Sequence, residues 1–193
     1  AMLANAGAKS ADQLTFRVDW IRASGQGEMP EGTWFLWTQG GSRLAKIAEY
    51  QLEAMGLEVK KVSSIPSAAE AAGHTVLCFW DGDMGAVEQA DAVARFGLEQ
   101  LKLVIEQAYE PKLVWITEGS APGVEVAKPT GLGPSVLWGM ARSARNEHSD
   151  LGLRLIDVAP GDDDLMHILD ALALVDEPEC LVGIDGVAVP RLS

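Results

Sequence analysis

Apolar and polar residues follow two different periods along this chain. Short apolar or alternating runs predict strands, and apolar residues three or four positions apart predict helices. The expected strands cover residues 15–21, 34–37, 57–62, 75–80, 113–117, 153–158, 180–184 and 187–189. The expected helices cover residues 42–55, 86–109 and 135–148, with a short helical turn within 63–73 and a further helix beginning near residue 162.

Strands that alternate with helices are typical of a parallel sheet covered by helices. The strand–helix–strand unit over residues 34–62 predicts the start of a Rossmann-like sheet of about six or seven strands. The alternating strand at 15–21 is expected at a sheet edge. Two short strands around a turn at Asp185 and Gly186 predict a C-terminal β-hairpin. The fold class is therefore α/β, with one domain over residues 14–193 after a loose lead-in at residues 1–13.

The chain is acidic, with a formal net charge of −13 over 193 residues. Duplex binding requires clustered Lys and Arg, and the sequence has no such cluster, so nucleic acid is not an expected partner. No apolar run approaches the length of a membrane span and no signal peptide is visible, so we expect a cytoplasmic protein without a membrane partner. Cys78 and Cys180 each lie in an apolar run and are expected to be buried thiols.

The turn after the strand at 34–37 is where a dinucleotide would bind in a Rossmann fold. The fingerprint needs Gly for the turn, Gly where the backbone approaches the pyrophosphate, and Gly or Ala against the helix. Gly40 and Ala45 fill the outer positions, but Ser42 stands in the middle, where its side chain would crowd a phosphate. We interpret Gly40 and Gly41 as a tight turn, although an anion at the following helix N-terminus stays physically possible.

The next strand lacks the residue that would bind the nucleotide ribose. An acidic side chain is needed there for the ribose hydroxyls, or an Arg for a 2′-phosphate. Lys60 and Lys61 lie inside that strand and could only reach outward, and the residues at its end are Val62, Ser63 and Ser64. The sequence therefore predicts no cofactor site in this chain.

Neither tyrosine has the partner that a short-chain reductase requires. Such enzymes use a Tyr as proton donor, a Lys four residues later that lowers the Tyr pKa, and a Ser that orients the carbonyl. Tyr50 is followed four positions later by Ala54, and Tyr109 by Leu113, with Lys112 one position short. No catalytic residue is assigned.

The remaining candidate groups favour structural roles. The three histidines, at positions 74, 148 and 167, have no ligand spacing, so a metal site is not expected, and His148 is interpreted as a helix C-terminal residue. The acidic run at 162–164 is interpreted as a helix start. Glu118 and Ser120 follow the strand at 113–117, where ligands bind in open α/β sheets, but a lone carboxylate and a loop serine are weak signals.

Four short motifs occur in order along most of the chain. They are FRVDW at 16–20, LVWITEGSA at 113–121, WGMARS at 138–143 and DGVAVPRL at 185–192. Together they resemble the structural subdomain of polyketide synthase ketoreductases. The resemblance implies a truncated Rossmann-like fold that performs no chemistry. In the catalytic half of such a reductase, the helix matching 135–148 carries Tyr-x-x-x-Lys, and here those positions hold Trp138 and Arg142. An indole N–H is not a usable acid near neutral pH.

The resemblance further implies the partners of the chain. They are the catalytic ketoreductase subdomain of the same polypeptide, which carries the NADPH site, and other synthase domains including the acyl carrier protein. Two alternatives stay open. One is a divergent NADPH-dependent short-chain reductase or nucleotide-binding α/β module with an unrecognised site near Gly40, Gly41, Glu118 and Ser120. The other is a small-ligand binding module with a pocket at the carboxyl edge of the sheet.

Overall fold

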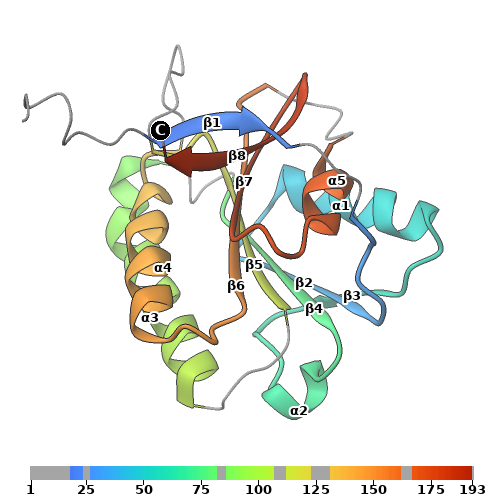
Figure 1. The fold of residues 1–193 in the computed structure, drawn as a ribbon. Coiled ribbons are helices and arrows are strands. Elements are labelled where there is room, and N and C mark those ends of the chain that lie inside the picture. Colours follow the sequence, from blue (N-terminus) through green and yellow to red (C-terminus); the bar gives the residue numbers. More distant parts are fainter. Residues whose placement is uncertain are drawn as a thin grey trace, which may run out of the picture.

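The computed structural model of the chain describes residues 18–23, 27–81, 86–106, 112–122, 131–161 and 167–192 (Figure 1). Its strands are β1 (Val18–Arg22), β2 (Trp34–Thr38), β3 (Val59–Val62), β4 (Thr75–Phe79), β5 (Lys112–Glu118), β6 (Leu153–Val158), β7 (Glu179–Gly183) and β8 (Gly186–Leu192). Its α-helices are α1 (Arg43–Ala54), α2 (Ala68–Ala71), α3 (Ala90–Glu106), α4 (Ser135–Glu147) and α5 (Ile168–Ala173), with a 3₁₀ turn, η3 (Val87–Gln89), ahead of α3.

All eight described strands form one sheet, in the order β1-β8-β7-β6-β5-β4-β2-β3. The strands from β3 to β7 in that order run parallel, and β8 pairs antiparallel with both β7 and β1. The complete Rossmann order is 3-2-1-4-5-6. In the described part of this chain no strand lies outside β3, and the connection from β3 to β4 contains only the four-residue helix α2. The fold is therefore a truncated Rossmann-like α/β fold, as predicted.

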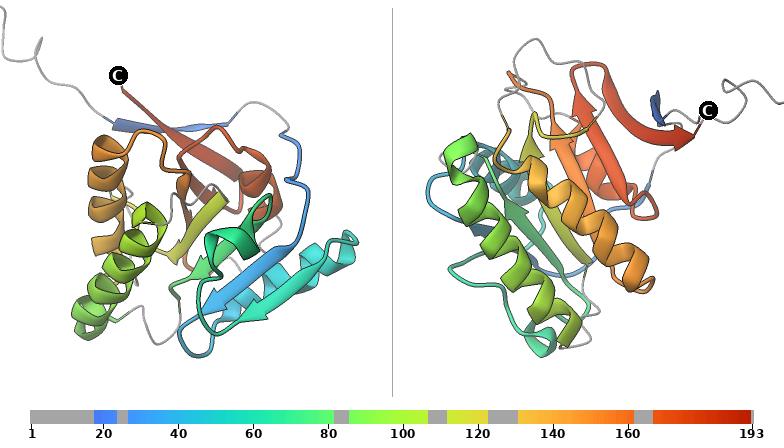
Figure 2. Two further views of the ribbon diagram at one scale, coloured as in Figure 1. Left: turned by 90° about the horizontal axis from the view of Figure 1, so that it is seen from below. Right: turned by 90° about the vertical axis from the view of Figure 1, so that its left-hand side faces the viewer.

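Helices cover both faces of the sheet (Figures 1 and 2). Helices α1 and α5 pack on one face, over a core that includes Leu36, Leu77, Ile116 and Ile156. Helices α3 and α4 pack side by side on the other face, over a core rich in tryptophan. Gly97 sets the spacing of these two helices, because a Cβ there would lie 2.6 Å from a methyl group of Leu137. Five of the six tryptophans are buried and Trp20 is partly buried, so these side chains serve as core and packing residues.

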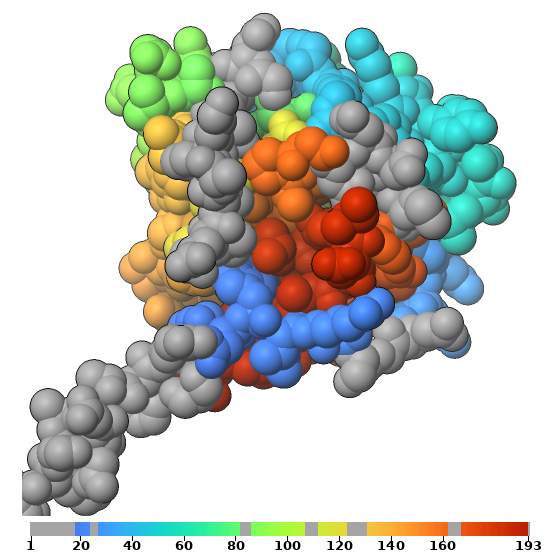
Figure 3. Space-filling model, turned by 90° about the horizontal axis from the view of Figure 1, so that it is seen from above, coloured from blue at the N-terminus to red at the C-terminus, as the bar shows by residue number. Residues whose placement is uncertain are grey.

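The first and last strands meet at one edge of the sheet. β1 pairs with β8 from Val18 opposite Leu192 to Arg22 opposite Ala188, and in Figure 3 the blue residues of β1 lie against the red residues of the C-terminal strands. The predicted edge position of this strand is confirmed. The predicted hairpin is also present, but its turn lies one residue earlier than predicted. Gly186 pairs with Gly183, so the turn consists of residues 184 and 185. Pairing buried valines across the two strands fixes this register.

Most other boundaries agree with the periodicity. The strand expected from residue 57 begins at Val59, because Leu57 still donates its N–H to a carbonyl of α1. The short helical turn within 63–73 is α2. Both cysteines are buried free thiols, and burial raises the pKa of Cys78 and of Cys180. The lead-in at 1–13, Tyr109 and the acidic run at 162–164 lie outside the described residues. No helix in the described ranges is long and apolar enough to span a bilayer.

Candidate functional site

The sheet reverses its order of connection between β2 and β4. From β2 the chain passes outward to β3, and from β4 it passes the other way to β5, β6 and β7. Open α/β sheets bind ligands outside the carboxyl ends of the strands at such a switch point. The residues that lie there come from the β2–α1 turn, the end of β4 and the end of β5.

The N-terminus of α1 is bonded to a carboxylate of the same chain. Asp81 follows β4 and is 4% exposed. Its Oδ2 accepts hydrogen bonds from the backbone N–H groups of Arg43, at 2.9 Å, and Leu44, at 3.1 Å. Its Oδ1 accepts the Ser42 hydroxyl at 2.5 Å, and the same hydroxyl oxygen accepts the Ala45 N–H at 2.8 Å. The N–H donors that hold a pyrophosphate in a Rossmann fold are thus bonded within the chain.

Glu118 is not the lone carboxylate that the sequence suggested. It lies at the end of β5, and its Oε1 accepts a hydrogen bond from the Arg43 guanidinium at 2.6 Å. This ion pair joins the start of α1 to the end of β5 across the switch point. Both side chains are partly exposed, 38% for Arg43 and 23% for Glu118.

Of the two turn glycines, only Gly40 is required by the backbone. Gly40 has φ +88°, a conformation that side chains disfavour. A Cβ on Gly41 would meet no atom within 4 Å. The pair therefore forms a turn in which one glycine is needed for its φ and the other has open space around it.

A second buried carboxylate, Asp157, holds the loop after β5. It accepts hydrogen bonds from the Thr117 hydroxyl at 2.5 Å, the Ser120 N–H at 2.9 Å and the Ala121 N–H at 3.1 Å. Burial raises the pKa of Asp157 to about 6 in spite of these bonds, and Glu118 adds to the rise. The Ser120 hydroxyl donates to the Gly131 carbonyl at 2.8 Å, so Ser120 fastens the loop, as its interpretation as a loop serine predicted.

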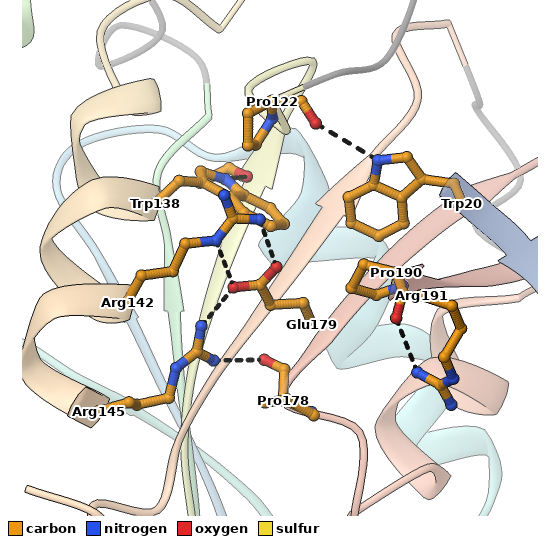
Figure 4. Close-up of polar contacts among 10 residues, drawn as sticks. Trp20, Pro122, Trp138, Arg142, Arg145, Pro178, Glu179, Pro190 and Arg191 are labelled. Atoms are coloured by element: carbon orange, nitrogen blue, oxygen red, sulfur yellow. Dashed lines mark hydrogen bonds and ion pairs between the residues drawn. The ribbon is translucent and has the colours of Figure 1, made fainter. Parts of the chain in front are cut away.

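Trp138 lies inside the protein between α4, β5 and β1 (Figure 4). Its side chain is 2% exposed, and its indole N–H donates to the Thr117 hydroxyl at 3.3 Å. The Trp20 ring packs edge-on against it at a centroid distance of 6.1 Å, and the Arg142 guanidinium lies 5.7 Å from its ring centroid. This indole offers a weakly acidic N–H already bonded within the core, so it has no proton to give to a substrate.

Arg142 is bound by Glu179, the first residue of β7 (Figure 4). Two parallel hydrogen bonds of 2.8 and 2.6 Å join the guanidinium to the carboxylate, the bidentate geometry that is strongest for this pair. Arg145, one turn later on α4, binds the same carboxylate and also the Pro178 carbonyl at 2.8 Å. Burial acts to raise the pKa of Glu179, but Arg142 and Arg145 outweigh it and hold that pKa below its usual value. Both arginines therefore fix α4 to β7.

The remaining tyrosine and histidine candidates lie apart from the switch point in the sequence or serve structural contacts. Tyr50 is 73% exposed on α1. The His74 Nδ1 accepts the Thr33 N–H at 3.0 Å, His148 ends α4 as predicted, and His167 pairs with Asp170 at 3.0 Å. Within the described residues, no three His, Cys, Asp or Glu side chains lie close enough to hold a metal ion.

An open cleft of about 550 Å³ lies beside the end of β3, next to α2. Lys60 and Lys61 are among the residues that line it, and each pairs with a glutamate, Glu58 at 3.0 Å and Glu49 at 2.8 Å. The other lining residues are Phe35, Val62, Ser63, Ser64, Pro66 and Glu70. One lining residue, Phe35, belongs to the core on the sheet face that α3 and α4 also cover.

Sequence reasoning missed the three carboxylates that organise these contacts: Asp81, Asp157 and Glu179. Each lies at a strand end, which is the one signal that could have singled them out. Their partners lie 34 to 40 residues away along the chain, so spacing alone could not reveal them.

The comparisons with known proteins agree with this architecture. The family model described as "Polyketide synthase extender module SpnB, Rossmann fold domain" matches residues 18–192. The PKS-NRPS hybrid synthetase acdB of Aspergillus candidus is 33% identical over 183 residues, which are 92% of this chain and 7% of that protein. The hybrid synthetase ATPKS of Aspergillus niger is 29% identical over 91% of this chain and 9% of that protein. The chain thus spans less than a tenth of the length of these two relatives.

Solved structures show the same fold. A C2-type ketoreductase from a modular polyketide synthase superposes with a TM-score of 0.65 at 20% identity, over 92% of this chain and 42% of the ketoreductase. The first ketoreductase of the tylosin polyketide synthase gives a TM-score of 0.65 at 21% identity, over 92% of this chain and 40% of that one. From the match over nearly its whole length, this chain belongs to the family of Rossmann fold domains of polyketide synthase extender modules.

Proposed function

We propose that this domain is the non-catalytic structural subdomain of a polyketide synthase ketoreductase. In this role it packs against a catalytic subdomain of the same polypeptide and stabilises it. The catalytic subdomain binds NADPH and reduces the β-ketoacyl group carried by an acyl carrier protein. The domain described here contributes a rigid surface and no reacting group.

The contact of Trp138, Arg142 and Glu179 carries this proposal. In a short-chain reductase a phenol with a nearby ammonium transfers the proton, and both groups must face the substrate. Here an indole is buried in the core, and the guanidinium four residues later makes two hydrogen bonds to one carboxylate. An Arg in such a pair cannot exchange a proton near neutral pH, and its pKa is raised further by the Glu179 hydrogen bonds. The groups at the reactive positions therefore serve packing.

The size of the relatives supports a role within a larger protein. The matched relatives are synthases of which this chain spans less than a tenth, and the ketoreductase structures are more than twice its length. A reductase built from two halves of similar fold would leave one half free to lose its chemistry while it retains its packing surface.

Titration of the purified domain with NADPH tests the absence of catalysis. We expect no saturable change in nicotinamide fluorescence, and no turnover of a β-ketoacyl thioester. A lone active ketoreductase assayed under the same conditions is the positive control. Saturable binding with turnover would refute the proposal and would establish the divergent reductase instead.

Co-expression with the catalytic segment of the same synthase tests the stabilising role. We expect the wild-type domain to raise both the soluble yield and the NADPH-dependent activity of that segment. The Glu177→Gln variant, which changes an exposed ion pair, is expected to do the same. Glu179→Ala, which removes the carboxylate that fixes α4, is expected to help less. If the wild-type domain leaves the catalytic segment unchanged, the proposed role is wrong.

A further inference from the structure

We propose that Asp81 excludes a nucleotide phosphate from this fold, because its carboxylate occupies the place at the α1 N-terminus that a pyrophosphate takes in a cofactor-binding Rossmann domain. The residues at the switch point therefore do not fit the dinucleotide that the fold implies. This inference assigns a role to one residue and does not depend on the packing role proposed above.

The strand register brings Asp81 to this position. β2 and β4 are neighbours, and Thr38 at the end of β2 lies opposite Phe79 at the end of β4. Asp81 follows two residues later, and α1 begins five residues after Thr38. The carboxylate therefore lies against the first turn of a twelve-residue helix.

Asp81 binds the donors that a phosphate would need at this helix end. Its two oxygens accept the N–H groups of Arg43 and Leu44 and the hydroxyl of Ser42. Ser42 in turn takes the Ala45 N–H. A helix N-terminus attracts an anion through its free N–H groups and the positive end of its dipole, and here both are satisfied by a charge of the chain itself.

Charge and space act in the same direction. The carboxylate is 4% exposed, so an incoming anion would have to displace it and strip it of hydrogen bonds to backbone donors. Hydrogen bonds to an ionised acceptor are among the strong ones. Glu118 binds the Arg43 guanidinium, which leaves that cation already paired with a carboxylate. A phosphate would thus meet the carboxylate of Asp81 at the helix end and a nearby guanidinium that Glu118 already binds.

Asp81 also explains why the middle fingerprint position need not be Gly. In a nucleotide-binding turn that Gly lets the backbone approach the pyrophosphate. Here Ser42 holds that position, and its hydroxyl links Asp81 to the helix. Ser42, whose side chain would crowd a phosphate, is thus the hydrogen-bond partner of Asp81, the carboxylate at the phosphate position.

The test compares the wild-type domain with Asp81→Ala and with Ser42→Ala. The first variant vacates the N–H groups of Arg43 and Leu44, and the second weakens the same contact but keeps the carboxylate in place. Each protein is titrated with pyrophosphate at constant ionic strength, and binding is followed by phosphorus NMR and by the melting temperature. We expect Asp81→Ala to bind pyrophosphate at least about tenfold more tightly than the other two proteins.

Two results would overturn the proposal. One is a folded Asp81→Ala variant that responds to pyrophosphate no more than Ser42→Ala does. The other is wild-type protein that binds pyrophosphate as tightly as the variant. If Asp81→Ala does not fold in chloride buffer, it is refolded in phosphate beside Glu179→Ala, which shares the general stabilising effect of the salt. The proposal is also wrong if phosphate restores the folding of both variants equally, or of neither. None of these results bears on the co-expression experiment, which uses a domain with Asp81 intact.

Discussion

Replacing Glu179 by Gln removes the negative charge that Arg142 and Arg145 share between α4 and β7. The carboxylate is 5% exposed and makes two hydrogen bonds to Arg142 and one to Arg145. Gln keeps the shape of the side chain but replaces one acceptor oxygen with an amide that points donors at a guanidinium. We therefore expect the variant to fold with a lower free energy of unfolding.

The size of the loss follows from the exposure of each arginine. Arg145 is 17% exposed, so its bond to the carboxylate counts as a buried charged hydrogen bond, worth about 1.5–3 kcal/mol. Arg142 is 42% exposed, and solvent screening reduces its share to about 0.2–1 kcal/mol. Together these give an expected loss of about 2–4 kcal/mol.

Urea unfolding at pH 7, followed by far-UV circular dichroism, measures this loss. The matched control is Glu177→Gln, which breaks an ion pair with Arg191 whose side chains are 24% and 48% exposed. That control should lose less than about 1 kcal/mol. Equal losses in the two variants, or a loss below about 1 kcal/mol in Glu179→Gln, would refute the view that this contact fixes α4 to β7.

The pH dependence gives a second check on the same residue. Because the folded pKa of Glu179 lies below its ordinary value of 4.5, the carboxylate stabilises the fold fully above that pH. The contribution is lost as the pH falls through the lower, folded pKa. The difference in unfolding free energy between wild type and Glu179→Gln should therefore shrink on acidification below pH 4.5.

Three further predictions concern other sites. Burial raises the pKa of Asp157 from 3.8 to about 6, so the folded state binds the proton more tightly than the unfolded state does. As the pH rises from 4 to 6, wild type should therefore lose about 1–3 kcal/mol of unfolding free energy relative to Asp157→Asn, measured by urea unfolding. In Gly131→Ala the added methyl would lie 2.0 Å from a backbone oxygen, so we expect the free energy of unfolding to fall by about 2–4 kcal/mol in the same assay. The control Gly41→Ala has open space around the added methyl and should change that free energy by less than about 0.5 kcal/mol. The double variant Trp138→Tyr, Arg142→Lys restores the reductase pattern but should show no NADPH-dependent reduction of a β-ketoacyl thioester, and turnover would contradict the exclusion of the cofactor.

Local pattern was enough to predict much of the fold. The apolar run at β2 and the helical spacing of α1 each depend on neighbours a few residues apart, and the structure confirms both. β1 is a strand as predicted, but its burial does not alternate: Val18 is exposed, whereas Asp19 and Trp20 are both partly buried. The turn of the hairpin was misplaced because Asp185–Gly186 is a favourable turn sequence, while the pairing of Val182 with Val187 decides the register.

The candidate site was predictable only where one end of a contact carried a motif. Trp138 and Arg142 stand out because the resemblance to ketoreductases places them where the catalytic half carries its Tyr and Lys. Asp81 does not stand out, because its role depends on the pairing of β2 with β4, which brings it to Ser42, 39 residues away. In the sequence Glu118 looks like a lone carboxylate, because its partner Arg43 lies 75 residues away.

The truncated side of the sheet has a consequence for how this domain meets other chains. β3 is an outermost strand of only four residues, and its two central residues, Lys60 and Lys61, are charged and exposed. A bare backbone edge invites strands from other molecules to add to it, and short length and lysines are the usual protection. The sheet edge that the truncation exposes therefore carries its own protection against strand addition by another chain.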